Sequence, residues 1–228
     1  MIPPIPGIVY SRDPHIASAS NDHRYYIKGP QPEVVVAEYV AYELAALMKL
    51  ATPPHALCRL GRDREVYFAS QEVRTRSGLD ELLKRGIARH PEFMCELAVF
   101  DIWITNHDRN RGNIVAEPVG GREGAEIELR AIDFEKSDLL SGTSGITVTA
   151  YAAGRYLPKL DLVPFCRNAS HRAPMLRKIH NVTSAQIEGI FTQLATAIGP
   201  VAWATSATHF LASRAANIAE LVTLEFNA

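Results

Sequence analysis

Cysteine is scarce in this sequence, and the three residues present, Cys58, Cys95 and Cys166, stand far apart. No Cys-x-x-Cys pair occurs, so neither a zinc ribbon nor a disulfide framework is indicated. A sparse, odd number of cysteines is typical of proteins from a reducing compartment. The first eleven residues lack the charged start and apolar core of a signal peptide. We therefore expect a cytoplasmic protein.

An excess of charge of either sign is also missing. The chain has 24 Lys and Arg residues against 25 Asp and Glu residues, for a formal net charge of −1. Without a global basic field, intrinsic binding of nucleic acid or of an anionic membrane surface is not expected. Arginines enrich the stretch from 59 to 89, but acidic residues are interleaved with them, which favours a solvated face.

Long hydrophobic runs are absent, with one stretch to consider. Gly189 to Ser213 contains no Asp, Glu, Lys or Arg, but it includes Gln193 and His209, and a Gly199-Pro200 step interrupts it. A helix that spans a membrane needs about 20 predominantly apolar residues. The stretch therefore predicts buried helices of a globular protein, with no membrane association.

The composition is that of an ordinary globular chain, 47% hydrophobic and 21% charged over 228 residues. Apolar spacing and turn residues predict a β-rich first third and a mostly helical remainder. Strands are predicted at 24–29, 57–60, 65–73, 114–116 and 127–132, and the last two are joined by a turn at Gly120-Gly121. Helices are predicted at 33–50, 78–89 and 91–105. The rest of the chain is predicted to be mostly helical, with Thr183 or Ser184 as the N-cap of one helix. This order indicates an α+β fold with a small β-rich N-lobe, residues 1–75, and a mostly helical C-lobe, residues 76–228.

The most informative residues lie in the segment FDIWITNHDRNRGN and in the later segment AIDFE. Asp108 and Asn113 stand five residues apart in one polar loop, and Asp133 ends an apolar strand that should pair with the strand after Asn113. Hairpin pairing would place Asn113 and Asp133 at one end of this ribbon. Amide and carboxylate oxygens are hard ligands that suit Mg²⁺, which takes phosphate oxygens and waters for the rest of its shell.

These residues match the requirements of phosphoryl transfer, namely an Asp at the acceptor hydroxyl, oxygen ligands for magnesium and a lysine on the nucleotide phosphates. Asp108 would face the same cavity, kept ionised by Arg109 or another cation. The lysine candidate is Lys28, a lone cation at the end of an apolar strand. Its predicted partner is Glu38, which lies one turn into the next helix, whereas Glu33 is too close to the proline-bounded turn.

At these residues the sequence resembles the HipA-like kinase family and is more distantly similar to phosphoinositide kinases. The resemblance rests on YIK at 26–28, AEYVAYELA at 37–45 followed by Pro53-Pro54, FDIWITNHDRNRGNI at 100–114 and AIDF at 131–134. It implies a two-lobed, protein-kinase-like fold that binds ATP and Mg²⁺. The match covers about half of the chain and looks like the short, core-only branch of the family, without the N-terminal subdomain of full-length HipA toxins.

The resemblance also implies a role for each matched residue. Lys28 would bind the ATP phosphates and Glu38 would pair with it, Asp108 would be the catalytic aspartate, and Asn113 and Asp133 would bind Mg²⁺. The hinge would lie within Ser70–Val73, where Glu72 and Val73 offer backbone groups to adenine. The phosphate loop would lie within 16–23, where Ser18 and Ser20 supply small side chains and backbone N–H donors.

Two departures from the pattern bear on activity. Glu135 stands where many kinases have Gly after Asp-Phe, which removes a flexible φ angle. The segment IASASNDH at 16–23 contains no glycine and no Gly-x-x-x-x-Gly-Lys element.

The expected function is therefore an ATP- and Mg²⁺-dependent kinase, and by resemblance the acceptor is a protein Ser or Thr. Two alternatives stay open: a nucleotide-binding pseudokinase or interaction module, and a kinase of a lipid head group or small alcohol that uses the same site. The family also implies toxin–antitoxin behaviour, with a small antitoxin-like partner protein that holds the kinase in check.

Overall fold

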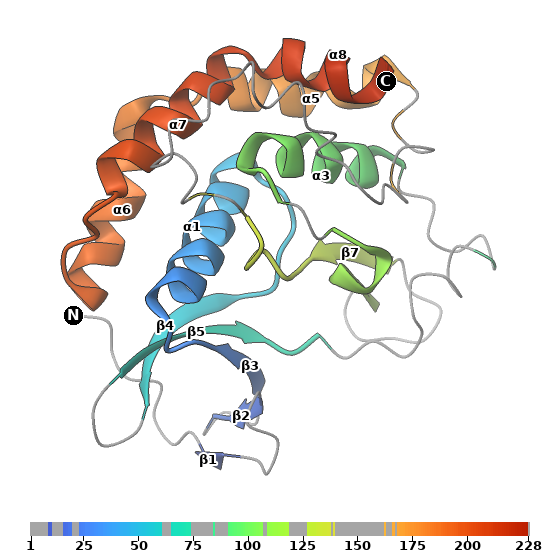
Figure 1. The fold of residues 1–228 in the computed structure, drawn as a ribbon. Coiled ribbons are helices and arrows are strands. Elements are labelled where there is room, and N and C mark those ends of the chain that lie inside the picture. Colours follow the sequence, from blue (N-terminus) through green and yellow to red (C-terminus); the bar gives the residue numbers. More distant parts are fainter. Residues whose placement is uncertain are drawn as a thin grey trace.

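The computed structural model describes residues 9–10, 16–19, 23–60, 65–73, 84, 91–106, 109–118, 127–137, 139, 162, 166 and 168–227. The sheet of β1 to β5 lies at one end of the molecule and the C-terminal helices lie at the other, with the β6–β7 ribbon near α3 (Figure 1). This confirms the prediction of an α+β fold with a small β-rich N-terminal part and a mostly helical C-terminal part, and the N-terminal sheet is antiparallel. The predicted lobe boundary, the helix at 78–89 apart from Lys84, and the turns at 61–63 and 120–121 lie outside the described residues.

The N-terminal sheet has five antiparallel strands in the order β1-β2-β3-β5-β4. Its strands are β1 (Val9–Tyr10), β2 (Ile16–Ser18), β3 (Arg24–Lys28), β4 (His55–Leu60) and β5 (Glu65–Gln71). The central strand β3 pairs with β5 in a register that sets Ile27 opposite Ala69 and Lys28 opposite Phe68. No strand was predicted before residue 24, and the pairing of β2 with β3 adds β2 to the sheet.

Helix α1 (Pro32–Met48) packs on the sheet and contacts α6 on its other side. It is buried almost all round, because its alanines, valines and tyrosines face both the sheet and the C-terminal helices. The helix ends two residues before the predicted boundary, where Lys49 adopts a left-handed conformation with φ 57° and its N–H bonds to carbonyls of the last turn.

The helical part is organised round α3 (Pro91–Ile104), whose described residues from Met94 onward are almost all buried. It contacts α5 (Ala169–His180), α7 (Ala204–Ala216) and α8 (Ile218–Asn227), which form an arc with α6 (Ser184–Ile198) over the molecule (Figure 1). A capping box at Thr183 starts α6, so the predicted N-cap is confirmed at the first of its two candidates.

A two-stranded ribbon connects these helices to the site. Strands β6 (Ile114–Pro118) and β7 (Ile127–Ala131) pair antiparallel, with Ile114 opposite Ala131, and a 3-10 turn, η1 (Arg111–Asn113), precedes β6. The segment that follows β7, yellow in Figure 1, runs back beside α1. The hairpin therefore returns the chain to the sheet and to the first helix.

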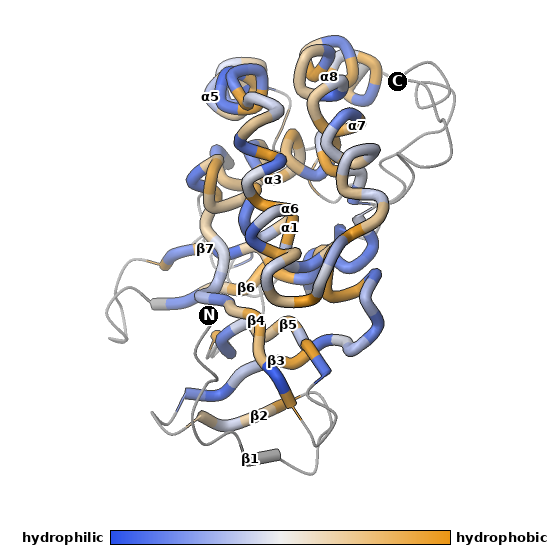
Figure 2. The backbone as a smooth tube through the Cα atoms, turned by 90° about the vertical axis from the view of Figure 1, so that its left-hand side faces the viewer, coloured by the Kyte–Doolittle hydropathy of each residue, from blue (hydrophilic) through white to orange (hydrophobic). Residues whose placement is uncertain are grey.

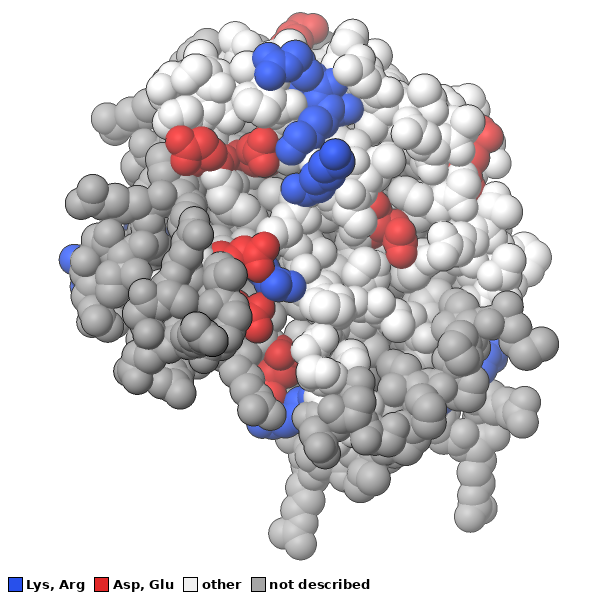
Figure 3. Space-filling view, turned by 180° about the vertical axis from the view of Figure 1, so that it is seen from behind, with Lys and Arg blue, Asp and Glu red and all other residues white. Residues whose placement is uncertain are grey.

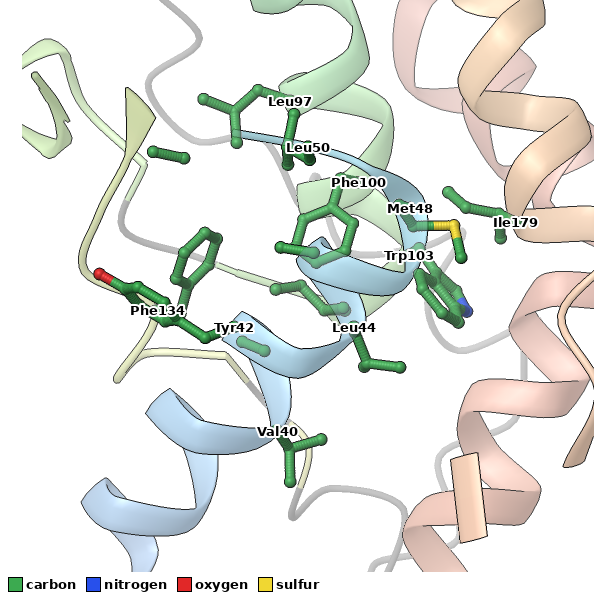
Figure 4. Close-up of a cluster of buried hydrophobic side chains, with 14 of the residues drawn as sticks. Val40, Tyr42, Leu44, Met48, Leu50, Leu97, Phe100, Trp103, Phe134 and Ile179 are labelled. Carbon is green, nitrogen blue, oxygen red and sulfur yellow. The ribbon is translucent and has the colours of Figure 1, made fainter. Parts of the chain in front are cut away.

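One hydrophobic core continues from the sheet through α1 and α3 to the C-terminal helices. Figure 4 shows part of it, where Tyr42 of α1 lies near Phe134 and Phe100. The Phe134 ring makes edge contacts with Tyr42 and Phe100, at centroid distances of 5.3 and 5.9 Å, and Phe100 contacts Trp103 at 6.0 Å. The residue after Asp133 is thus anchored in the centre of the molecule.

The stretch without charged residues forms α6 and α7, separated at Gly199-Pro200 as predicted. The expectation that these helices are buried is only half right, because α6 buries Ile187, Ile190, Phe191 and Leu194 on one face and exposes the other. Figure 2 shows the hydrophobic stripes of the helices and the largely hydrophilic course of α5. Among the described residues, no helix combines the length and hydrophobicity needed to cross a membrane.

Candidate active site

The side chain of Lys28 is the centre of the candidate site. Its Nζ atom lies 2.6 Å from Oε1 of Glu38, 2.5 Å from Oδ1 of Asp133 and 3.3 Å from Oε2 of Glu135. Lys28 ends the central strand of the sheet, Glu38 lies on α1, and the two acidic residues follow β7. The site is therefore built from three parts of the chain, and one of its ion pairs joins residues 105 positions apart.

Electrostatics keep Lys28 in its charged form. Burial by itself would lower the pKa of Lys28, but the charges of Glu38 and Asp133, with the hydrogen bonds to them, outweigh burial and raise the pKa above its usual range. The ammonium is therefore a permanent cation at neutral pH, which is the state that binds a phosphate.

Glu38 holds Lys28 from the interior of the molecule. Its side chain is 1% exposed, and its Oε1 atom also accepts a hydrogen bond of 3.0 Å from the backbone N–H of Phe134. Burial raises the pKa of Glu38, and the neighbouring ammonium of Lys28 offsets part of this rise. The pair predicted between Lys28 and Glu38 is present. Glu43 of the same helix lies 3.2 Å from His55 instead.

The conformation of the Asp-Phe-Glu segment is set at Asp133. Its φ of 62° lies in the left-handed region, which few residues other than Gly, Asn and Asp adopt. Glu135 is not among the described residues with positive φ, so its position does not require a glycine. The departure from Asp-Phe-Gly therefore imposes no backbone strain, and its consequence is the added carboxylate.

Arg109 ties the loop after α3 to the segment after β7. Its Nε atom donates to Asp101 at 2.8 Å, and its Nη1 atom donates to the carbonyls of Asn113 and Ile132 at 2.9 and 2.5 Å. The guanidinium also lies 4.6 Å from the centroid of the Phe134 ring. Sequence reasoning proposed Arg109 as a partner of Asp108, but it missed this buried network.

Asp101 is the other half of that network. Its two oxygens accept hydrogen bonds from Arg109 and from Nδ2 of Asn106, and the carboxyl is fully buried. Burial raises the pKa of Asp101, and the charge of Arg109 opposes this rise. These contacts give Asp101 a structural role toward the loop after α3.

The structure places Asn113 and Asp133 at the same end of the ribbon, as hairpin pairing predicts. The backbone N–H of Ile132 donates to the carbonyl of Asn113 at 3.1 Å, and Asn113 is itself buried. Asp108 and Ser20 lie outside the described residues, so their roles stay predictions. Ser18 is on β2 and pairs in register with Arg24, next to the β2–β3 turn.

The predicted hinge continues β5. The backbone N–H of Gln71 donates to the carbonyl of Pro54, and that of Glu72 donates to the carbonyl of Arg24, at 2.8 and 2.7 Å. Glu72 also forms an ion pair with Arg24. Any N–H offered to adenine within this segment would therefore have to come from Val73.

The donor set round Lys28 fits a divalent cation. Glu38, Asp133 and Glu135 each offer an oxygen, and these oxygens lie within 4.8 Å of one another. The Oε2 atom of Glu38 is buried without a hydrogen-bond partner among the described residues. Three carboxylates against one ammonium leave an excess of negative charge, and all-oxygen donors are what Mg²⁺ prefers. Sequence reasoning selected Asp133 for such a site but not Glu135.

A cavity of about 670 Å³ lies away from these residues, between the start of α1, strand β5 and the α6–α7 connection. Arg59 and Glu65 are its charged lining residues, and Val36 and Trp203 are among its apolar ones. It contains neither Lys28 nor Asp133, so it is separate from the candidate site.

Charges on the face seen from behind are mixed (Figure 3). Lys and Arg side chains gather where α5 lies, whose last turn carries Arg177, Lys178 and His180, with acidic side chains beside them. Two acidic residues of α3 pair with α5, Glu92 with His171 and Glu96 with Lys178. The predicted solvated face of the arginines at 59–89 is a different surface, and all of these arginines except Arg59 lie outside the described residues.

The fold is kinase-like. It has an N-terminal sheet, a first helix whose glutamate pairs with a lysine of the sheet, and a hairpin that is followed by acidic residues next to that lysine. Residues 10–119 match the family model of the HipA-like kinases, which confirms over that range the resemblance found in the sequence. A comparison with curated protein sequences gives no match.

Two solved structures show the same fold. The Helicobacter pylori proinflammatory kinase CtkA is similar over 99% of this chain and 98% of its own, with a TM-score of 0.60 and 15% identity. HipA of Shewanella oneidensis, solved with HipB and operator DNA, is similar over 97% of this chain and 65% of its own, with a TM-score of 0.53 and 12% identity. Family match and fold together support a kinase.

Proposed function

We propose that this protein is a kinase that uses ATP and Mg²⁺ and transfers the γ-phosphate to a Ser or Thr hydroxyl of a protein. The observation that carries the proposal is the ion-pair set of Lys28 with Glu38 and Asp133. A strand lysine fixed by a helix glutamate beside a hairpin aspartate is the arrangement that positions nucleotide phosphates in kinases.

Each residue has a part in this reaction. Lys28 donates to the phosphates, and Glu38 keeps its ammonium in place. Asp108 accepts or orients the proton of the acceptor hydroxyl, with the loop that carries it anchored through Arg109 to Asp101. Asp133 and Asn113 would hold the Mg²⁺, with Glu135 close by. A bound Mg²⁺ supplies neutralisation of the charge on the phosphates.

The acceptor and the partner are inferred from the family. The sequence resembles HipA-like kinases over the residues that would do the chemistry, and the acceptor assigned by that resemblance is a protein Ser or Thr. Shewanella HipA is solved together with HipB and its operator DNA. This supports a small antitoxin-like protein as a partner of this chain. The proposal that the kinase itself has no intrinsic nucleic-acid binding rests only on its balanced charge. We assign the protein to the cytoplasm from its cysteine content.

Transfer of labelled γ-phosphate from ATP tests the proposal. Purified protein is incubated with Mg²⁺ and with peptides that contain Ser or Thr, and both self-labelling and peptide labelling are recorded. We expect Asp108→Asn and Asp133→Asn to lower transfer at least about 100-fold. Glu128→Gln, which removes an exposed carboxylate from the same hairpin, should behave as wild type. Equal transfer by wild type and Asp108→Asn would remove Asp108 from the mechanism.

A second candidate, a nucleotide-binding pseudokinase, is favoured by one observation. The Lys28 ammonium already contacts three carboxylates, and the third of them, Glu135, replaces a glycine of active kinases. In this case ATP with Mg²⁺ would raise the melting temperature without any turnover. Turnover that Asp133→Asn abolishes would exclude this candidate.

Lipid head groups and small alcohols remain as alternative acceptors. Phosphatidylinositol vesicles and inositol, offered in parallel with the peptides, distinguish them. Labelled lipid or inositol in the absence of labelled peptide would replace the protein acceptor in the proposal.

A further inference from the structure

Glu135 is the contact of Lys28 that the proposed reaction does not use. Its Oε2 atom is 3.3 Å from Nζ, whereas the contacts of Glu38 and Asp133 measure 2.6 and 2.5 Å. The side chain of Glu135 is one third exposed, while that of Glu38 is almost completely buried. Of the two glutamates on Lys28, Glu135 therefore has the longer contact and the less buried carboxylate.

The number of donors on Lys28 makes this contact matter. An ammonium has three N–H donors, and three carboxylates surround this one. Lys28 donates hydrogen bonds to Glu38 and Asp133, and the Glu135 carboxylate stands 3.3 Å from the same nitrogen as a third, ion-paired neighbour. A nucleotide phosphate that uses the third donor of Lys28 therefore competes with the Glu135 carboxylate for this position. Glu38 is held in place by the Phe134 amide. The side chains of Asp133 and Glu135 are equally exposed, but Asp133 accepts a hydrogen bond of 2.5 Å from Lys28, whereas Glu135 is an ion pair at 3.3 Å, so Glu135 is the group that moves most easily.

A second partner for the displaced carboxylate is already in reach. The Oε1 atom of Glu135 lies 3.8 Å from Nζ of Lys136, an exposed side chain on the solvent side. When phosphate oxygens approach Lys28, repulsion between like charges favours the outward position of Glu135 beside Lys136.

We propose that Glu135 occupies the phosphate position on Lys28 in the nucleotide-free protein and lowers the affinity for the nucleotide, which must displace it. This inference rests on the proposed nucleotide-binding function of Lys28. Glu135 would thus act on the nucleotide through Lys28, as a positioning residue. It also explains what an acidic residue does directly after Asp-Phe.

Equilibrium binding of Mg²⁺·ADP, measured by calorimetry on the full chain, tests the proposal. Glu135→Gln removes the charge of the side chain and keeps its size. We expect Mg²⁺·ADP binding to become roughly three- to tenfold tighter, because the nucleotide no longer displaces a partly exposed ion pair. Glu135→Asp keeps a carboxylate and should stay near wild type. The matched control is Glu128→Gln, an exposed glutamate of β7 paired with Arg130, which should leave binding unchanged.

A double-mutant cycle shows whether the effect passes through Lys28. In a Lys28→Gln background, Glu135→Gln should change Mg²⁺·ADP binding less than about twofold, because the competition has been removed. In turnover, Glu135→Gln should lower KM for ATP in step with the dissociation constant. If Lys28→Gln does not fold, the Mg²⁺·ADP affinities of Glu135→Gln and Glu135→Asp still show whether the charge of Glu135 weakens nucleotide binding.

Unchanged or weaker binding by Glu135→Gln overturns the proposal, and weaker binding together with a higher Mg²⁺ requirement would make Glu135 a metal ligand instead. If wild type binds Mg²⁺·ADP and Lys28→Gln weakens that binding, but Glu135→Gln equals wild type, only the role of Glu135 falls. If wild type binds no nucleotide at all, the proposed function falls and the role of Glu135 falls with it.

Discussion

At the scale of single residues, the main feature is a buried carboxylate that depends on one cation. Glu38 has one oxygen shared by Lys28 and the Phe134 amide and another without a partner among the described residues. Breaking a buried ion pair by removing one partner leaves an uncompensated charge, which is far more costly than the pair itself is stabilising. Lys28 is therefore expected to support the fold as well as the reaction.

Replacing Lys28 tests this dependence through pH. Burial raises the pKa of Glu38, and the charge of Lys28 is the largest effect that lowers it. Lys28→Gln should therefore raise the pKa of Glu38 further. A carboxyl whose folded-state pKa exceeds its unfolded value stabilises the fold at low pH and loses that contribution as the pH rises through the folded pKa. We expect urea unfolding to show Lys28→Gln less stable than wild type at about pH 8, with a smaller difference at about pH 5.

Lys178→Gln is the matched control for this experiment. Lys178 pairs with Glu96 at 3.3 Å, but both side chains are partly exposed. Its loss should change stability by less than about 1 kcal/mol at either pH. If the difference in unfolding free energy between wild type and Lys28→Gln stays constant with pH, the raised pKa assigned to Glu38 is contradicted.

At the scale of elements, the site depends on how the loop after α3 meets the ribbon. Arg109 contacts the side chain of Asp101 in the last turn of α3. It also contacts the backbone carbonyls of Asn113, just before β6, and Ile132, just after β7. One guanidinium thus fixes the separation between the predicted metal ligands. Bidentate geometry of this kind is specific to arginine.

Arg109→Lys should therefore uncouple these elements although the charge is kept. We expect a loss of about 2–4 kcal/mol in the free energy of unfolding, because buried acceptors lose their donors. In phosphate transfer, kcat should fall by about tenfold or more, while KM for ATP changes little, since Lys28 is untouched. Arg130→Lys, at a partly exposed position on β7, should change neither quantity appreciably. An Arg109→Lys protein with wild-type kcat would show that the network is only structural.

At the scale of the whole molecule, hydrogen bonds from the C-terminal helix α7 hold the end of α3, which leads into the loop with Asp108. Arg214 of α7 is 2% exposed and donates from Nε to the carbonyl of Trp103 at 2.8 Å and from Nη2 to that of Ile102. Trp103 in turn donates from Nε1 to the carbonyl of Leu211 at 3.0 Å. A cation at the carbonyl end of α3 also complements the helix dipole.

Arg214→Met tests this connection with a side chain that fills similar space. Loss of the buried donors should lower the free energy of unfolding by about 2–4 kcal/mol, measured with urea. Mg²⁺·ADP binding at a temperature where the variant is folded should stay near wild type, because no site residue changes. Arg177→Met on the exposed side of α5 is the control and should be neutral within about 0.5 kcal/mol. Equal stability of Arg214→Met and wild type would contradict the role assigned to Arg214.

The sequence by itself determined the elements and the pairs that are close along the chain. Apolar spacing determined α1 and α3, the capping residue determined the start of α6, and strand pairing placed Asn113 and Asp133 at one end of a ribbon. Lys28 and Glu38 could be paired because they are ten positions apart on adjacent elements. These inferences work because periodicity and hairpin geometry are local.

Only the tertiary structure decided which side chains share the space between the sheet and the ribbon. Glu135 reaches Lys28, and Arg109 reaches Ile132, because α1 and the core round Phe134 bring together segments that no local pattern connects. Burial of Glu38 is likewise a property of the packed core, since the same residue on an isolated helix would be solvated. Long-range packing therefore sets the electrostatics of the site, and its charge balance cannot be derived from residue spacing.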